Sequence, residues 1–148
     1  MARNIIGVIV GYVAMAAFVF ISFTVLYLIL GAEGSFQPGS YQVSNVWLVL
    51  SLILGFTAAV IGGYICMLIA KNKKAAMWFA GIVFVLGLIL AIPQLNVSDE
   101  EMNKMRTGDA SNIEAMQNAK QPVLTLLLNP LIGAFGVWAG SRMWKPKN

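Results

Sequence analysis

IIGVIVGYVAMAAFVFISFTVLYLIL, which runs from Ile5 to Leu30, decides the fold of this chain. The stretch has 26 residues and contains no Asp, Glu, Lys, Arg or His. A transmembrane helix needs about 20 predominantly apolar residues, so this segment is long enough to cross a bilayer with some tilt. The apolar core of a cleaved signal peptide is only about 7 to 15 residues long. We therefore interpret the segment as a retained transmembrane helix.

Three further charge-free apolar stretches follow, at residues 46–70, 75–92 and 122–141. The whole chain of 148 residues has a mean hydropathy of +0.78. Only 11% of its residues are charged, whereas a soluble domain carries about 25%. The sequence therefore predicts an all-α integral membrane protein over 1–148, a single bundle of four transmembrane helices at about 5–30, 46–70, 75–92 and 122–141. Loops are expected at 31–45 and 94–121.

The charged residues sort to opposite ends of the predicted helices. The two loops contain six acidic residues and three basic ones. The other side holds both chain ends and the turn after residue 70, and it contains seven basic residues and no acidic one: Arg3, Lys71, Lys73, Lys74, Arg142, Lys145 and Lys147. Lys and Arg accumulate in cytoplasmic segments, so we expect both termini in the cytoplasm. The expected location is multi-pass in a bacterial inner membrane.

The loop at 94–121 contains two helix-start signals. In both Ser98–Glu101 and Ser111–Glu114, a serine precedes a glutamate by three residues, which is the pattern of a capping box. We therefore predict two short extracytoplasmic helices, at about 99–106 and 112–120. Each helix has a thin apolar stripe that could cover the bundle, rest on the bilayer or dock a partner. The stripe residues are Met102, Met105, Ile113 and Met116.

The loop at 31–45 is rich in Gly, Ser, Gln and Pro, and we interpret it mainly as a connector. Gly31 can close the helix before it, and Ser44 can cap the helix after it. Phe36 and Tyr41 are expected to fold back toward the helix ends.

Small residues recur along one face of each predicted helix. Because small residues permit close backbone approach in lipid, we expect these positions to pack against helices of this chain or of another. The candidates are Gly7, Gly11, Gly55, Ala59, Gly62, Gly133, Gly136 and Gly140. Gly7 and Gly11 also form a GxxxG motif, which has little specificity alone because glycine is common in membrane helices.

Asn129 and Pro130 stand out inside the last predicted span. Proline removes a helical N–H and clashes with the carbonyl four residues earlier, so a kink is expected. We favour an interhelical hydrogen bond from Asn129 at this bend, because polar groups in lipid need partners. A gating hinge or a polar binding point at membrane depth is the functional alternative. In a third interpretation, Pro130 opens a new helix with Asn129 as its cap.

The composition excludes several kinds of chemistry. The chain has no histidine and one cysteine, Cys66, so it lacks the commonest general base and cannot form an internal disulfide or a cysteine metal cage. No catalytic, cofactor-binding or metal-binding residue is predicted, and no nucleic-acid partner. In length and four-span layout the chain resembles small multidrug transporters, but the glutamate of their first helix is missing here.

We therefore expect a non-catalytic membrane protein that contacts lipids. The first hypothesis is an accessory or structural subunit of a larger inner-membrane complex, packed against other membrane subunits or copies of itself. The alternative is a small oligomeric channel or facilitator for a neutral solute, with a path lined by hydroxyls and Asn129. A membrane-sensing or assembly factor is a third hypothesis.

Overall fold

The computed structural model describes residues 1–98, 105–106 and 110–145. These residues form five helices: α1 (Ala2–Ser35), α2 (Asn45–Ala70), α3 (Lys73–Leu95), α5 (Asn112–Asn118) and α6 (Val123–Met143). The four longer helices are long and apolar enough to cross a membrane. α5 lies within the second predicted short helix. The first, 99–106, falls outside the described residues except at Met105 and Arg106, which are not helical.

Short polar side chains begin two of the long helices. The Ser44 hydroxyl accepts a hydrogen bond from the backbone N–H of Trp47 at 3.1 Å, as predicted, and this satisfies one of the unpaired donors of α2. Asn72 does the same for α3 through the N–H of Lys74, at 3.0 Å. Gly31 has a φ of 63°, so it interrupts α1, but one further helical turn carries the chain to Ser35.

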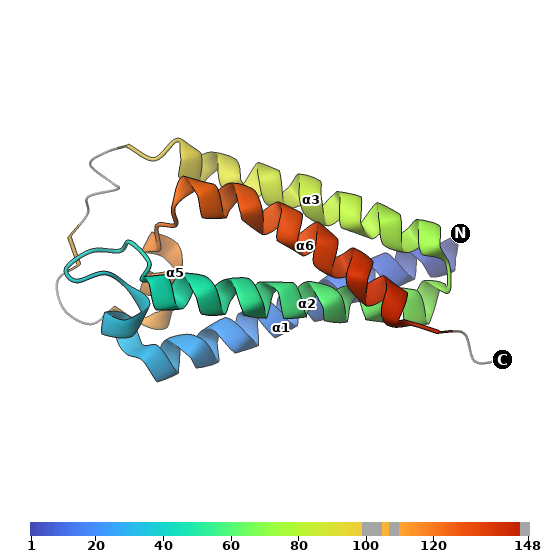
Figure 1. Ribbon diagram of the computed structural model, residues 1–148, viewed down its shortest axis with the longest axis horizontal. Coiled ribbons are helices and arrows are strands. Elements are labelled where there is room, and N and C mark those ends of the chain that lie inside the picture. Colours follow the sequence, from blue (N-terminus) through green and yellow to red (C-terminus); the bar gives the residue numbers. More distant parts are fainter. Residues whose placement is uncertain (99–104, 107–109, 146–148) are drawn as a thin grey trace.

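The four long helices form a bundle in which each runs antiparallel to the long helix before it in the chain (Figure 1). α1 packs against α2, α2 against α6, and α6 against α3, whereas α1 meets α3 only over a short length. Both chain ends and the α2–α3 turn therefore lie at one end of the molecule (Figure 1). This end, called the basic end below, contains Arg3, Lys71, Lys73, Lys74, Arg142 and Lys145.

Close backbone contact joins α1 to α2 in the half near the basic end. A Cβ added at Gly11 would lie 2.7 Å from the Gly62 carbonyl oxygen, and one added at Gly62 would lie 2.9 Å from that of Gly11. A Cβ at Gly7 would lie 2.9 Å from the Cys66 carbonyl oxygen. Only glycine permits such an approach, which maximises dispersion contacts between the helices.

The same stretch of α2 contacts α6 through the next residue. A Cβ added at Gly63 would overlap the backbone carbonyl of Val137, and one added at Gly140 would overlap that of Val60. Adjacent residues of a helix point about 100° apart, since 3.6 residues make a turn. The Gly62–Gly63 pair therefore lets α2 touch two neighbours closely. The core around this crossing buries Phe79 completely.

Candidate functional site

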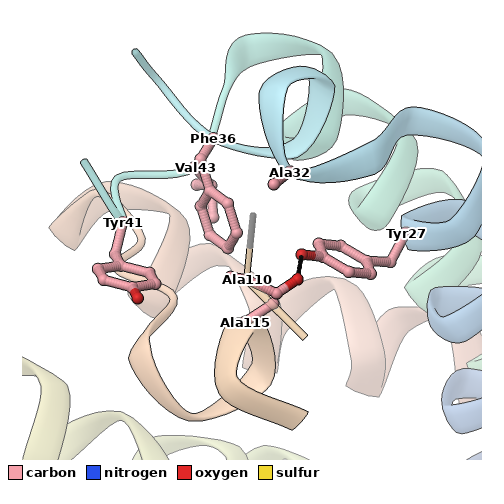
Figure 2. Packing of buried hydrophobic residues seen from close by; sticks show 7 residues of the cluster. All are labelled: Tyr27, Ala32, Phe36, Tyr41, Val43, Ala110 and Ala115. Carbon is pink, nitrogen blue, oxygen red and sulfur yellow. Dashed lines mark hydrogen bonds between the residues drawn. The ribbon is translucent and has the colours of Figure 1, made fainter. Parts of the chain in front are cut away.

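A second hydrophobic core closes the other end of the bundle. It is called the cap below and comprises residues 32–44, 105–106 and 110–121, together with Tyr27 of α1. Its buried residues come from both loops and converge in Figure 2: Tyr27, Ala32, Phe36, Tyr41, Val43, Ala110 and Ala115. The Phe36 ring lies edge-on to Tyr41 and Tyr27, at centroid distances of 5.7 and 6.4 Å. The predicted return of Phe36 and Tyr41 toward the helix ends is confirmed.

Hydrogen bonds join the two loops across this core. The Tyr27 hydroxyl donates to the Ala110 carbonyl at 2.5 Å (Figure 2). The backbone N–H of Lys120 donates to the Tyr41 carbonyl at 2.9 Å, and the N–H of Val43 donates to the Lys120 carbonyl at 3.0 Å. The loop at 31–45 is therefore half of a folded unit, which the interpretation as a connector did not anticipate.

The glutamate of the second capping box has a different partner from the one predicted. Ser111 caps α5 by accepting from the N–H of Glu114 at 3.3 Å. The Glu114 carboxylate accepts a 2.5 Å hydrogen bond from the Tyr41 hydroxyl, so it ties α5 to the other loop. This hydrogen bond, together with desolvation and repulsion between the carboxylate and a phenolate, raises the pKa of Tyr41.

Arg106 is the one basic side chain buried in the described part of the cap. Its guanidinium is 3% exposed, and Nη2 lies 2.5 Å from a carboxylate oxygen of Glu33, which is itself 76% exposed. Arg106 also lies over the Phe36 ring, 6.0 Å from its centroid, and its backbone N–H donates to the Gly39 carbonyl at 3.0 Å. The sequence offered one signal for this role, a basic residue within a mostly acidic loop.

The predicted contact residues of the cap remain largely uncovered. Met105 is 82% exposed, Ile113 69% and Met116 55%. Met102 lies outside the described residues. Ser40 pairs with Met105 in an isolated antiparallel bridge, so the Met105 side chain is presented from a fixed backbone.

A cleft of about 420 Å³ lies inside the bundle, in the half near the cap. It exists because α1 packs on α2 and α3 packs on α6, whereas α1 and α6 do not contact each other. Its lining is mostly apolar and includes Met15, Phe20 and Met116, together with Gly55. A Cβ added at Gly55 would meet no described atom within 4 Å, so this predicted packing residue faces the cleft and not a closely packed helix.

Asn129 lines this cleft beside Gln121. Its amide Nδ2 donates to the Gln121 Oε1 at 3.1 Å, so its partner is in the segment before α6 and not on another long helix. The ring of Pro130 packs on Gly87 of α3, where an added Cβ would lie 2.9 Å from the proline Cγ. α6 runs continuously from Val123 to Met143, so the interpretation of Pro130 as a helix start is wrong.

The remaining small residues of α6 contact two different helices. A Cβ added at Gly133 would lie 3.0 Å from Val83 of α3, and one at Gly136 would lie 2.6 Å from the Cβ of Ala59 on α2. Gly133 also borders the cleft, so α6 separates from α2 within about one turn of the contact between Gly136 and Ala59.

Several hydroxyls within the long helices donate to carbonyls of their own helix. Ser22 bonds the Phe18 carbonyl at 2.7 Å, and Thr57 bonds the Ile53 carbonyl at 2.8 Å. Ser51, which lines the cleft, bonds the Leu48 carbonyl at 3.0 Å. The polar groups of the cleft available to a ligand are therefore chiefly the amides of Asn129 and Gln121 and the hydroxyl of Tyr12.

Within the described part of the chain, no group of three or more His, Cys, Asp or Glu side chains is arranged to hold a metal ion. Comparisons with models of protein families, with curated proteins and with solved structures found no match. Function is therefore inferred from the cap, the cleft and the distribution of charge.

Proposed function

We propose that this chain is a non-catalytic accessory or structural subunit of a larger membrane complex, and that it contacts its partner through the cap. Its four long helices span the bilayer. The basic end lies in the cytoplasm and the cap lies outside, since Lys and Arg favour the cytoplasmic side. The excess of basic residues at the chain ends and the α2–α3 turn fits a bacterial inner membrane with both termini inside.

The observation that carries this proposal is the exposure of large apolar side chains on a cap that is otherwise well packed. Exposed apolar surface on the long helices needs no explanation, because lipid covers it. Exposed apolar surface outside the hydrocarbon is different, because burying it in an interface is favourable. Met105 is 82% exposed and Ile113 is 69% exposed, although the cap buries Phe36 and Tyr41.

The cap is also organised to hold such a surface rigidly. Ser111 caps α5, the Tyr41 hydroxyl donates to Glu114, and Arg106 bonds both Glu33 and Gly39. A preorganised surface loses little conformational entropy on binding, so more of its contact energy becomes affinity.

The proposal is tested by pulldown in mild detergent from cells that express a tagged chain at its native level. A stoichiometric membrane partner is expected by mass spectrometry, and the Met105→Ser/Ile113→Ser variant should lose most of it. Met143→Ser is the matched control, because Met143 is 64% exposed at the basic end. Absence of any stoichiometric partner contradicts the subunit role, and a partner retained by the double variant contradicts docking through the cap.

The Asn129–Gln121 pair supports a second candidate, an oligomeric facilitator for a neutral solute that passes through the cleft. Exposed amides at membrane depth are costly unless they meet a polar group. This candidate predicts flux of a small polyol such as glycerol into proteoliposomes, abolished in Asn129→Leu and unchanged in Thr57→Val, whose hydroxyl bonds only its own helix. No flux above empty liposomes is the outcome that the subunit proposal expects.

A further inference from the structure

A pocket of about 510 Å³ opens at the basic end, where the end of α2, the start of α3 and the end of α6 meet. Four of its lining residues are cations: Lys71, Lys73, Arg142 and Lys145. Among the described residues, no acidic one lines it. The structure describes two acidic residues, Glu33 and Glu114. Glu33 lies in the last turn of α1, after Gly31, and Glu114 lies in α5; both elements are at the opposite end of the molecule (Figure 1).

The local backbone concentrates this charge. Lys71 ends α2 in the left-handed conformation, with a φ of 50°, and so turns the chain sharply into α3. Lys73 then stands in the first turn of α3, which contains no acidic residue. The first turn of a helix already carries partial positive charge and favours acidic side chains. A lysine here adds to that positive potential, and a bound anion would relieve it.

Arg142 is positioned by an aromatic ring. Its Cζ lies 4.3 Å from the centroid of the Trp138 ring, a cation–π contact. Stacking uses the face of the guanidinium and leaves the N–H groups around its edge free to meet an acceptor. Arginine at such a site binds phosphate oxygens by two parallel hydrogen bonds.

The rest of the lining is apolar, and this determines what kind of anion fits. Met67, Met77, Trp138 and Trp144 border the pocket, and the Met77 side chain is 68% exposed. The pocket therefore places cations beside surface that faces acyl chains in a bilayer. A ligand with a phosphate and attached hydrocarbon satisfies both parts, whereas free phosphate satisfies only the first.

We propose that this pocket binds the phosphate headgroup of an anionic phospholipid, with Arg142, Lys71, Lys73 and Lys145 around the phosphate and a chain along Met77. The proposal depends on the long helices spanning a bilayer, but not on docking through the cap. Basic pockets between transmembrane helices are known to hold anionic headgroups.

The chain offers a closely matched pair of variants. Lys73→Gln/Arg142→Gln removes one lysine and one arginine from the pocket. Arg3→Gln/Lys74→Gln removes the same charge from the same end, at residues that do not line the pocket. Circular dichroism and gel filtration first establish that both variants are folded.

Each detergent-purified protein is titrated with phosphatidylglycerol and, separately, with phosphatidylcholine, and bound lipid is counted by native mass spectrometry. Wild type should bind phosphatidylglycerol preferentially. The pocket variant should bind it about tenfold or more weakly, and the control variant within about threefold of wild type. Equal weakening in both variants, or no preference for the anionic lipid, overturns the proposal. Displacement of phosphatidylglycerol by equimolar inorganic phosphate would also overturn it, in favour of a soluble anion.

Discussion

Gly63→Ala should destabilise the bundle, whereas the same substitution at Gly55, on the same helix, should not. The Cβ added at Gly63 would overlap the Val137 carbonyl oxygen and lie 2.8 Å from the Val137 Cα, so only a shift of α2 away from α6 can accommodate it. At Gly55 nothing lies within 4 Å, because that residue borders the cleft.

The expected magnitudes follow from these distances. Overpacking a tight interface costs about 1–3 kcal/mol, and replacing a helical glycine with alanine recovers about 0.5–1 kcal/mol. The overlap with the Val137 backbone places Gly63→Ala in the upper half of the overpacking range, at about 2–3 kcal/mol. Gly63→Ala should therefore lower the free energy of unfolding by about 1–2.5 kcal/mol. Gly55→Ala has no steric term, so it should raise that free energy by about 0.5–1 kcal/mol.

The assay is equilibrium unfolding in mixed micelles, with denaturing detergent increased stepwise and helicity followed by circular dichroism. The two variants should move the unfolding midpoint in opposite directions from wild type. A Gly63→Ala midpoint at or above that of wild type would refute the close α2–α6 crossing. A Gly55→Ala loss as large as that of Gly63→Ala would refute the open cleft.

Three further predictions concern the cap and the orientation. Glu114 raises the pKa of Tyr41 above its ordinary value of 10.0, so the Tyr41–Glu114 hydrogen bond stabilises the cap below pH 10.0 and is lost as pH rises through the raised pKa. The near-ultraviolet circular dichroism of the cap should therefore persist below pH 10.0 and decrease in part above it. The Tyr41→Phe variant should lack this step. Arg106→Ala removes a charge-assisted hydrogen bond to Glu33, so it should destabilise the cap by about 1–3 kcal/mol. Amide hydrogen exchange in α5 should then become faster, and unchanged exchange would contradict this prediction. The orientation is tested with single cysteines in a cysteine-free background. Gln117→Cys should react with a membrane-impermeant maleimide in intact spheroplasts, whereas Lys145→Cys should react only after lysis. The reverse pattern would invert the proposed orientation.

The long helices were predictable because their signals are local. The run from Ile5 to Leu30 contains no charge, so predicting a helix long and apolar enough to cross a membrane needs no knowledge of any other segment. Ser44 and Ser111 each cap a helix by accepting a hydrogen bond from the residue three positions later. The close contacts at Gly11 and Gly62 likewise follow from a spacing on one helix face.

The cap was not predictable to the same degree, because it depends on contacts between distant segments. Tyr27 and Ala110 are 83 residues apart, and Tyr41 and Glu114 are 73 apart, so no local pattern announces either hydrogen bond. Asn129 is a different case: its amide meets Gln121, which is only eight residues away in the sequence, and not a group on another long helix.

Site-specific photocrosslinking in intact membranes tests the central proposal most directly. A photoreactive phenylalanine derivative is placed at Ile113, on the exposed surface of the cap, and at Met143, equally exposed at the basic end. Docking through the cap predicts one discrete protein adduct from position 113, identified by mass spectrometry, and none of that mass from position 143. Adducts with lipid alone at position 113, or the same protein adduct from both positions, would contradict a partner bound to the cap.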